Sequence, residues 1–317
     1  MDSDGPRSHR FQPRTMRLPV RPGAYSLGLV GYPIDKSLSP VMHEAALAHY
    51  GLEGSYRRFD APALEDLARA FKALELGSLH GFNVTLPWKL DAARLVVDNG
   101  GVLCGAAAHL EVANTIVMRQ TGDMARPTRL EGHNTDVAGL VAAIRERWPT
   151  LRDPPAQASR ACVLGAGGAA YAAVLALREL GFHEVRIWNR TSPAAHRLVS
   201  KLNMGHVVTD IEHATSKSSL VLQATTIGMG ESGDDYRELV DFAMRALDGT
   251  AEDARIVDLV YHPRPTVWVA AANALGRQAD DGLSMLIHQA ALAFSLWTGH
   301  PPPVAVMRAA VEPLLAG

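Results

Sequence analysis

The sequence predicts an α/β protein with two domains, the second of which contains a doubly wound parallel sheet. The chain has 317 residues, enough for two domains that each bury a core. Its second half alternates short apolar runs with helical segments, which is typical of βαβ units. At Arg160–Ala170 an apolar run breaks at a glycine and continues as a small-residue helix, a pattern typical of a strand–turn–helix nucleotide site.

Composition bounds the possible partners. Hydrophobic residues make up 47% of the chain, charged residues 20%, and the formal net charge is -2, so no basic excess favours nucleic acid. No apolar run approaches the roughly 18 residues that span a bilayer. The two cysteines, Cys104 and Cys162, lack metal-ligand spacing. We therefore expect a cytoplasmic protein with reduced cysteines, no metal, no nucleic-acid or membrane partner, and a small-molecule ligand.

Residues 1–24 contain several arginines and prolines but no apolar stretch of the kind found in secretory signals. We predict a disordered tail here. An organelle-targeting segment is the alternative, and Asp2 and Asp4 argue against it.

The first strand is predicted at residues 25–30, and it leads to a segment with two serines. Ser39 followed by Pro40 is typical of a helix start, so capping is one account of Ser39. Ser37 lies two residues earlier and is not explained by capping. Two hydroxyls at a helix N-terminus would bind a small carboxylate, which is the functional alternative.

A second strand is predicted at residues 56–60, a helix at 63–76, and a third strand near 82–86. In that third strand Asn83 and Thr85 alternate with apolar residues and point to the opposite face. Pro87 ends the strand and Lys89 follows it. An amide, a hydroxyl and an ammonium group thus converge at the carboxyl end of a strand, where ligands bind in open α/β sheets. A solvated polar face is the alternative.

Asn114-Thr115 begins a further predicted strand, and Asn134-Thr135-Asp136 opens a helix predicted at 137–148. Thr135 or Asp136 could serve merely as the helix N-cap. His133, just before them, is interpreted as a surface loop residue.

The glycine-rich turn matches a dinucleotide fingerprint, with Gly165, Gly167 and Ala170 at its three small-residue positions. The first glycine permits the turn, the second admits a pyrophosphate, and the third residue lets the helix pack on its strand. We predict that the backbone of this turn binds a dinucleotide; a purely structural turn is the alternative. The predicted phosphate-binding residues are Gly165, Ala166, Gly167, Gly168 and Ala169.

Further strands are predicted at 184–189, 207–209, 220–223 and 255–259, with helices at 169–180 and 193–202. Asn189, Arg190 and Thr191 stand at the end of the strand at 184–189, where an acidic residue would bind an adenosine ribose. Arg190 instead offers a cation for a 2′-phosphate, so we predict NADP, with NAD as the alternative cofactor. A solvated arginine is the other interpretation.

The remaining candidates follow later strands. Thr225 and Tyr261 are placed to line the nicotinamide side of the site, with Tyr261 assigned to substrate. Gly282 and Met285 are assigned to cofactor binding. Gln289 lies in a very apolar helix that continues through 290–297, and its amide needs a buried partner, either a polar ligand or a backbone group.

These motifs together resemble the shikimate dehydrogenase family, including its quinate/shikimate relatives. Any one of them is weak evidence, but their shared order is specific, and they cover nearly all of the chain from about Tyr25 on. The matching segments are Gly31–Pro40, Gly81–Lys89, Asn114–Thr115, Asn134–Asp136, Gly165–Ala170, Asn189–Thr191, Ala224–Gly228 and Gly282–Gln289.

The resemblance implies an NADP-dependent oxidoreductase of the shikimate pathway that interconverts 3-dehydroshikimate and shikimate. It implies that Ser37 and Ser39 hold the substrate carboxylate and that Lys89 and Asp136 form the catalytic pair. It also implies a discontinuous substrate-binding domain of residues 25–135 and 282–317 around a Rossmann-type NADP-binding domain of residues 136–281. Residues implied to bond the substrate hydroxyls are Asn83, Thr85, Asn114 and Gln289.

Acid–base chemistry agrees with this assignment, because a ketone that becomes an alkoxide needs a proton donor within hydrogen-bond reach.

Tyr171 and Ala194 stand where the family often has basic residues, and Val137 resembles some quinate-using members. Quinate or an amino-substituted analogue is therefore the alternative substrate. A non-catalytic metabolite sensor is the alternative from another class, and a monomer or homodimer is expected.

Overall fold

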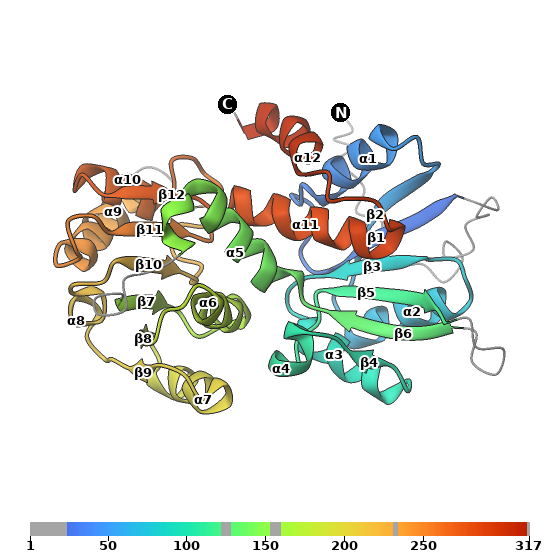
Figure 1. Cartoon of the computed structure of the whole chain (residues 1–317), viewed down its shortest axis with the longest axis horizontal. Helices are drawn as coiled ribbons and strands as arrows, with labels where there is room; N and C mark the ends of the chain where they lie inside the picture. Colours follow the sequence, from blue (N-terminus) through green and yellow to red (C-terminus); the bar gives the residue numbers. More distant parts are fainter. Residues whose placement is uncertain (1–23, 122–127, 153–159, 231–233, 316–317) are drawn as a thin grey trace, which may run out of the picture. The chain divides into compact units, whose positions relative to one another are not determined.

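The protein folds into two α/β units, each built on a six-stranded sheet (Figure 1). The structure is a computed structural model that describes residues 24–121, 128–152, 160–230 and 234–315. Unit 1 comprises the described residues up to Thr135 and those from Ala290 on; unit 2 comprises Asp136–Gln289. The segment 1–23 of the predicted tail lies outside the described residues, and residues 282–289 fall in unit 2.

Unit 1 contains a mixed sheet with strand order β2-β1-β3-β5-β6-β4. Strand β1 pairs in parallel with β2 and β3, whereas β5 runs antiparallel to both β3 and β6. Its strands are β1 (Tyr25–Gly31), β2 (Gly54–Asp60), β3 (Gly81–Val84), β4 (Val102–Leu103), β5 (Thr115–Gln120) and β6 (Thr128–His133).

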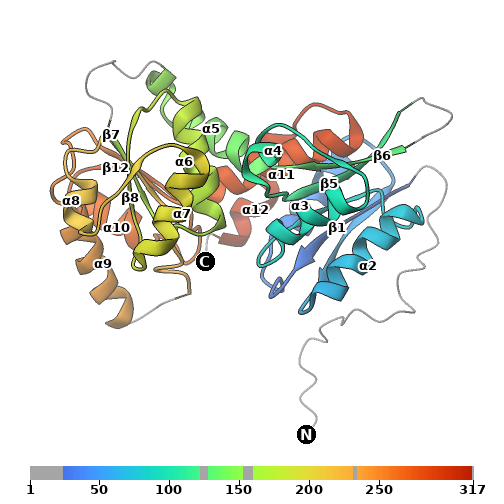
Figure 2. The same cartoon turned by 90° about the horizontal axis from the view of Figure 1, so that it is seen from below.

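Helices cover both faces of this sheet (Figures 1 and 2). The face with Phe82 and Val84 packs on α2 and α3, where the rings of Phe71 and Phe82 meet edge to face at 5.3 Å. The opposite face, with Tyr56, packs on α1 and α11. The helices are α1 (Ser39–His49), α2 (Leu64–Glu75), α3 (Lys89–Asp98), α4 (Ala106–Leu110), the part of α11 (Leu283–Thr298) from Ala290 on, and α12 (Val304–Val311), followed by a short 3-10 turn (Glu312–Leu315).

The start of α1 corrects one sequence interpretation. The N-cap residue is Leu38, and no side chain caps the helix there, so Ser39 is the first helical residue rather than the cap. Its hydroxyl instead pairs with that of Ser37. The capping account of Ser39 is therefore wrong, and both serine hydroxyls lie together at the start of the helix.

Unit 2 contains a wholly parallel sheet with strand order β12-β11-β10-β7-β8-β9. Counted from β7, this order runs outward in both directions from the first strand, so the predicted doubly wound sheet is confirmed. The strands are β7 (Arg160–Leu164), β8 (Glu184–Trp188), β9 (His206–Val207), β10 (Leu220–Gln223), β11 (Arg255–Asp258) and β12 (Gln278–Asp280).

The helices of unit 2 lie on both sides of its sheet, with α6 on one side and α8, α9 and α10 on the other (Figures 1 and 2). Cys162, Val221 and Ile256 meet Trp268 of α10 in the core on the second side. The helices are α5 (Thr135–Arg147), a 3-10 turn (Pro149–Arg152), α6 (Gly168–Glu179), α7 (Ser192–Leu202), α8 (Ile211–Thr215), α9 (Asp234–Leu247) and α10 (Val267–Ala274). None of the helices in the described parts of the chain is long and apolar enough to span a membrane.

Candidate active site

Ser37 and Ser39 form a hydroxyl pair in the turn between β1 and α1. The Ser37 hydroxyl donates to Ser39 Oγ at 3.2 Å and accepts from the Ser39 backbone N–H at 3.3 Å. Arg58 Nη2 donates to the Ser37 carbonyl oxygen at 2.5 Å. Two adjacent hydroxyls beside a guanidinium group suit an anionic ligand.

The Asn83 amide is fixed by three buried neighbours. Its Oδ1 accepts from the Tyr56 hydroxyl at 2.8 Å, and its Nδ2 donates to Thr115 Oγ1 at 3.0 Å and to the Asn114 carbonyl oxygen at 3.1 Å. Both amide N–H groups are thus engaged within the protein. Toward a ligand hydroxyl, Asn83 retains its role as an acceptor.

Tyr56 supports this arrangement from strand β2. Burial raises the pKa of its hydroxyl well above the usual value, and the side chain of Ser39 and the charge of Arg58 oppose that rise. His43 stacks on the Tyr56 ring with centroids 4.3 Å apart. Burial lowers the pKa of His43 to about 3 although Asn83 opposes the shift, so the imidazole is neutral near neutral pH. Neither ring nitrogen of His43 forms a hydrogen bond with a described residue.

Asn114 holds the N-terminus of α5. Its Oδ1 accepts from the Thr135 backbone N–H and from the Thr115 hydroxyl, both at 2.9 Å, and its Nδ2 donates to Thr135 Oγ1 at 3.0 Å. Because Thr135 is the first residue of α5, Asp136 lies inside the first helical turn and is buried. Both Thr135 and Asp136 are thus helical residues, one position or more beyond the place of an N-cap. The side chain of Asn114, from the residue before β5, accepts from the first backbone N–H of the helix.

Lys89 begins α3, directly after the turn that follows β3. The Ala113 backbone N–H donates to the Lys89 carbonyl oxygen at 2.9 Å. Thr85 precedes this turn, and its N–H donates to the Val30 carbonyl oxygen at 2.9 Å. Consecutive residues, Ala113 and Asn114, therefore anchor the start of α3 and the start of α5.

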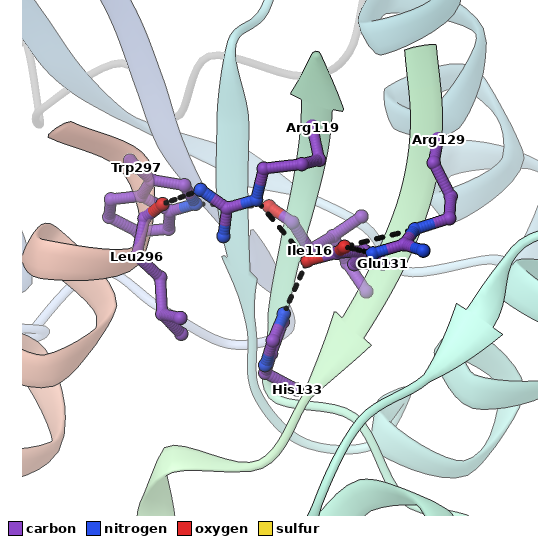
Figure 3. A network of polar contacts seen from close by, with 7 residues as sticks. All are labelled: Ile116, Arg119, Arg129, Glu131, His133, Leu296 and Trp297. Atoms are coloured by element: carbon purple, nitrogen blue, oxygen red, sulfur yellow. Dashed lines mark hydrogen bonds and ion pairs between the residues drawn. The ribbon is translucent and has the colours of Figure 1, made fainter. Parts of the chain in front are cut away.

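A buried carboxylate organises the outer part of the sheet (Figure 3). Glu131 on β6 accepts from Arg129, from His133 at 3.1 Å, and pairs with Arg119 at 3.4 Å. Desolvation would raise the pKa of Glu131, but these hydrogen bonds and charges outweigh it and hold the pKa below its usual value. His133 is the last residue of β6 with a largely buried side chain, so its interpretation as a surface loop residue is wrong.

Cys104 also approaches this network. Ligand atoms of Cys104, Glu131 and His133 all lie within 4.8 Å of one another, a spacing that the sequence interpretation did not anticipate. The carboxylate is already shared by two guanidinium groups, whose positive charge would repel a divalent cation. Burial and the Glu131 charge raise the pKa of the Cys104 thiol, which keeps it protonated. The cluster acts as an ion-pair network that joins β5 to β6.

In unit 2 the glycine-rich turn joins β7 to α6 as predicted. Gly165 has a φ of +119°, and a Cβ at this position would lie 2.9 Å from the Ala224 backbone, so only glycine fits. A Cβ at Gly167 or Gly168 would meet nothing within 4 Å. Ala170 is completely buried at the helix–sheet contact. The turn thus leaves open space in front of a helix N-terminus, as a bound pyrophosphate requires.

The three residues after β8 lie at the exposed edge of unit 2. Asn189 Nδ2 donates to the carbonyl oxygen and to Oγ1 of Thr191, both at 2.9 Å, which shapes the turn. Arg190 between them is exposed. Its charge is therefore available to a ligand phosphate, while Asn189 and Thr191 hold the loop.

The carboxyl ends of β10 and β11 are joined by a buried carboxyl group. Asp258 Oδ1 accepts from the Val260 N–H at 3.0 Å and from Gln223 Nε2 at 3.2 Å. The other carboxyl oxygen, Oδ2, forms no hydrogen bond with a described residue. Burial raises the pKa of Asp258 to about 7, against the nearby Thr266 hydroxyl and the Val260 N–H. Sequence reasoning missed this carboxyl group because it reads as the polar end of an apolar strand.

The predicted ligand residues Thr225 and Tyr261 follow these two strands and are half-buried. Thr225 Oγ1 accepts from the Ile227 N–H at 3.1 Å, and burial raises the pKa of the Tyr261 hydroxyl. Both residues therefore follow the carboxyl ends of parallel strands. Whether they touch a ligand stays a prediction.

Gln289 lies on α11 against α5 within unit 2. A Cβ at Gly139 would lie 2.8 Å from the Gln289 backbone nitrogen, so this glycine lets the two helices approach closely. Gln289 Nε2 donates to the Leu286 carbonyl oxygen at 2.8 Å, a backbone partner of the kind left open as its alternative. Near the start of α11, Met285 is half-buried, and a Cβ at Gly282 would clash with Leu259.

Comparison with known proteins identifies the family of this chain. The family described as "Shikimate dehydrogenase substrate binding domain" matches residues 29–116, and "Shikimate 5'-dehydrogenase C-terminal domain" matches 282–312. The chain is 36% identical over 298 residues to shikimate dehydrogenase (NADP(+)) of Methanopyrus kandleri, covering 90% of this chain and 94% of that protein.

Solved structures agree with the sequence comparison. Shikimate 5-dehydrogenase from Thermus thermophilus in complex with NADP(H) and shikimate has a TM-score of 0.73 at 34% identity, covering 91% of this chain and 99% of that one. Quinate dehydrogenase from Corynebacterium glutamicum in complex with NAD has a TM-score of 0.74 at 31% identity, covering 90% and 98%.

The doubly wound fold, its glycine-rich turn and these relatives together define a nicotinamide-nucleotide-dependent oxidoreductase. Its polar site in unit 1 suits a small hydroxylated acid. Within that class, the chain belongs to the shikimate dehydrogenase family.

Proposed function

We propose that this protein catalyses the reversible, NADPH-dependent reduction of 3-dehydroshikimate to shikimate. The observation that carries the proposal is the group of side chains on one face of the unit 1 sheet, where the Ser37–Ser39 hydroxyl pair and the fixed amide of Asn83 lie. Hydroxyls beside a guanidinium group suit a carboxylate, and amides suit ring hydroxyls. The Thermus thermophilus relative was solved with shikimate and NADP(H).

Substrate binding is assigned residue by residue. Ser37 and Ser39 would hold the carboxylate, and Tyr261 would contribute its hydroxyl. Asn83 would accept from a ring hydroxyl, since both of its N–H groups are engaged inside the protein. Thr85, Asn114 and Gln289 would bond the remaining hydroxyls. In this proposal, residues 25–135 and 282–317 form the substrate-binding domain and 136–281 the NADP-binding domain.

Proton transfer is assigned to Lys89, with Asp136 as its partner. The Lys89 ammonium group would donate a proton to the ketone oxygen and stabilise the negative charge that develops on it. Asp136 would orient that ammonium group and accept from a neighbouring hydroxyl. Two neighbouring hydrogen bonds support this pairing. The Ala113 N–H donates to the Lys89 carbonyl oxygen, and the Asn114 side chain accepts from the N–H of Thr135, the residue before Asp136.

Cofactor binding is assigned to the turn of Gly165–Ala169. Its backbone N–H groups would bind the pyrophosphate, and Arg190 would bind a 2′-phosphate. When bound, the nicotinamide supplies or accepts the hydride at the ring carbon. Thr225, Gly282 and Met285 would border the nicotinamide.

Quinate oxidation is the second candidate, favoured by the likeness to the quinate dehydrogenase of Corynebacterium glutamicum, which was solved with NAD. Val137, which follows Asp136, is the residue of this chain that resembles quinate-using relatives. We rank shikimate first because the Methanopyrus kandleri relative, at 36% identity, is named shikimate dehydrogenase (NADP(+)).

Steady-state kinetics with shikimate and quinate, each with NADP and with NAD, test the proposal. The highest kcat/KM is expected for shikimate with NADP. A higher value for quinate would favour the second candidate. Binding of shikimate without any turnover would favour a metabolite sensor.

We also propose that the protein is cytoplasmic and that it is a monomer or a homodimer. Light scattering of the purified protein would determine its oligomeric state.

A further inference from the structure

Arg58 is the cation on strand β2 beside the serine pair, and the residue assignments above do not include it among the substrate ligands. Arg58 lies opposite Leu29 of β1, and Asn83 of β3 lies opposite the same residue from the other side. Residues in one such row point to one face of the sheet, with Cα atoms of alternate strands about 10 Å apart. Arg58 therefore lies on the face, and in the row, of the Asn83 amide.

The contacts of the neighbouring residues confirm this orientation. Tyr56 precedes Arg58 by two positions and therefore points to the same face. Its hydroxyl reaches Asn83 Oδ1 at 2.8 Å. Arg57, between them, points to the opposite face and is exposed. Two adjacent arginines thus differ in which side of the sheet they occupy.

The guanidinium group of Arg58 lies against the serine turn. Its Nη2 donates to the Ser37 carbonyl oxygen at 2.5 Å, while the hydroxyls of Ser37 and Ser39 lie 3.2 Å apart in the same turn. Among the described residues no carboxylate forms an ion pair with Arg58. A single hydrogen bond to a neutral carbonyl leaves further N–H donors on the planar fork.

Charge is what the serine pair lacks. Two neutral hydroxyls can hydrogen-bond a carboxylate but cannot offset its charge, whereas a guanidinium group does both. We propose that Arg58 is a specificity-determining residue that attracts and binds the carboxylate of the substrate together with Ser37 and Ser39. This inference rests on the proposed function and extends it, because it makes the carboxylate charge a condition for tight binding.

The test compares shikimate with its methyl ester, which lacks the charge, in the full-length wild type and in Arg58→Gln, Arg58→Lys and Arg57→Gln. For shikimate, Arg58→Gln is expected to raise KM about tenfold with little change in kcat. Arg58→Lys should retain part of the effect, and Arg57→Gln should resemble the wild type. For the methyl ester, Arg58→Gln should raise KM much less than it does for shikimate, because the ester carries no charge. Added salt should raise the KM for shikimate more in the wild type than in Arg58→Gln.

Two results would overturn the inference. One is an unchanged KM for shikimate in Arg58→Gln. The other is an equal loss for shikimate and for its methyl ester, which would indicate a structural role for Arg58 in holding the Ser37 turn. Either result would leave wild-type turnover of shikimate intact, so failure of this inference is distinguishable from failure of the proposed function.

Discussion

The side-chain amide oxygen of Asn114 accepts a hydrogen bond from the backbone N–H of Thr135 at 2.9 Å. This contact satisfies a donor at the start of α5, and both residues are buried. The same amide meets the Thr115 and Thr135 hydroxyls. Asn114 therefore helps to hold the start of α5, which carries Asp136.

Replacing Asn114 should be costly for stability. Asn114→Ala leaves the Thr135 N–H buried without its acceptor, so we expect a loss of about 1–3 kcal/mol in the free energy of unfolding, measured with urea. Asn99→Ala is the matched control, since the Asn99 side chain is exposed and bonds within its own helix end. Equal stability of the two variants would contradict the capping role.

Lys89 is predicted to act mainly on turnover. Lys89→Ala removes the proposed proton donor, so kcat should fall by about 10²- to 10⁴-fold, with a modest change in KM for shikimate. Lys72→Ala, at an exposed lysine on α2, should leave both constants unchanged. An unchanged kcat with a large rise in KM would instead make Lys89 a binding residue.

Arg190 is predicted to select between the two nicotinamide cofactors. Arg190→Ala removes a cation from the proposed 2′-phosphate site, so KM for NADP should rise by about 10- to 100-fold while KM for NAD stays constant. Arg197→Ala on the following helix is the control, because Arg197 is also exposed. If Arg190→Ala uses NADP as well as the wild type does, the assignment is refuted.

Asp258 is predicted to give the folded protein a pH-dependent stability. Its pKa is raised from 3.8 to about 7 in the folded state, so between these values the folded chain holds a proton that the unfolded chain has lost. Stability from this group should fall as pH rises from about 4 to about 7 and then level off. Urea denaturation over this range should show the fall in wild type and in Asp253→Asn, which changes an exposed carboxyl group, but not in Asp258→Asn. A parallel pH dependence in all three would exclude Asp258 as its source.

Local sequence patterns were sufficient for the elements that carry the dinucleotide turn. The apolar run before Gly165 and the small residues after it form β7 and α6, because both elements bury most of their side chains. Helices α8, α9 and α10 were not predicted. For α9, polar residues surround its narrow apolar stripe, which packs on a core formed by distant strands.

The residues proposed to face the ligand could be predicted from the sequence. The buried residues that hold them in place could not. Tyr56 reads as an ordinary strand aromatic, and its role depends on reaching Asn83 across an intervening strand. Glu131 reads as an exposed acid, yet it is buried by arginines from two strands and by His133 (Figure 3). Such contacts depend on strand order, which local periodicity does not encode.

The most direct test of the central claim is to follow the hydride itself. NADPH carrying deuterium at the transferable position of the nicotinamide should yield shikimate with one deuterium on the new carbinol carbon, detected by mass spectrometry. Product without deuterium, or no product from 3-dehydroshikimate, would contradict the proposed reaction.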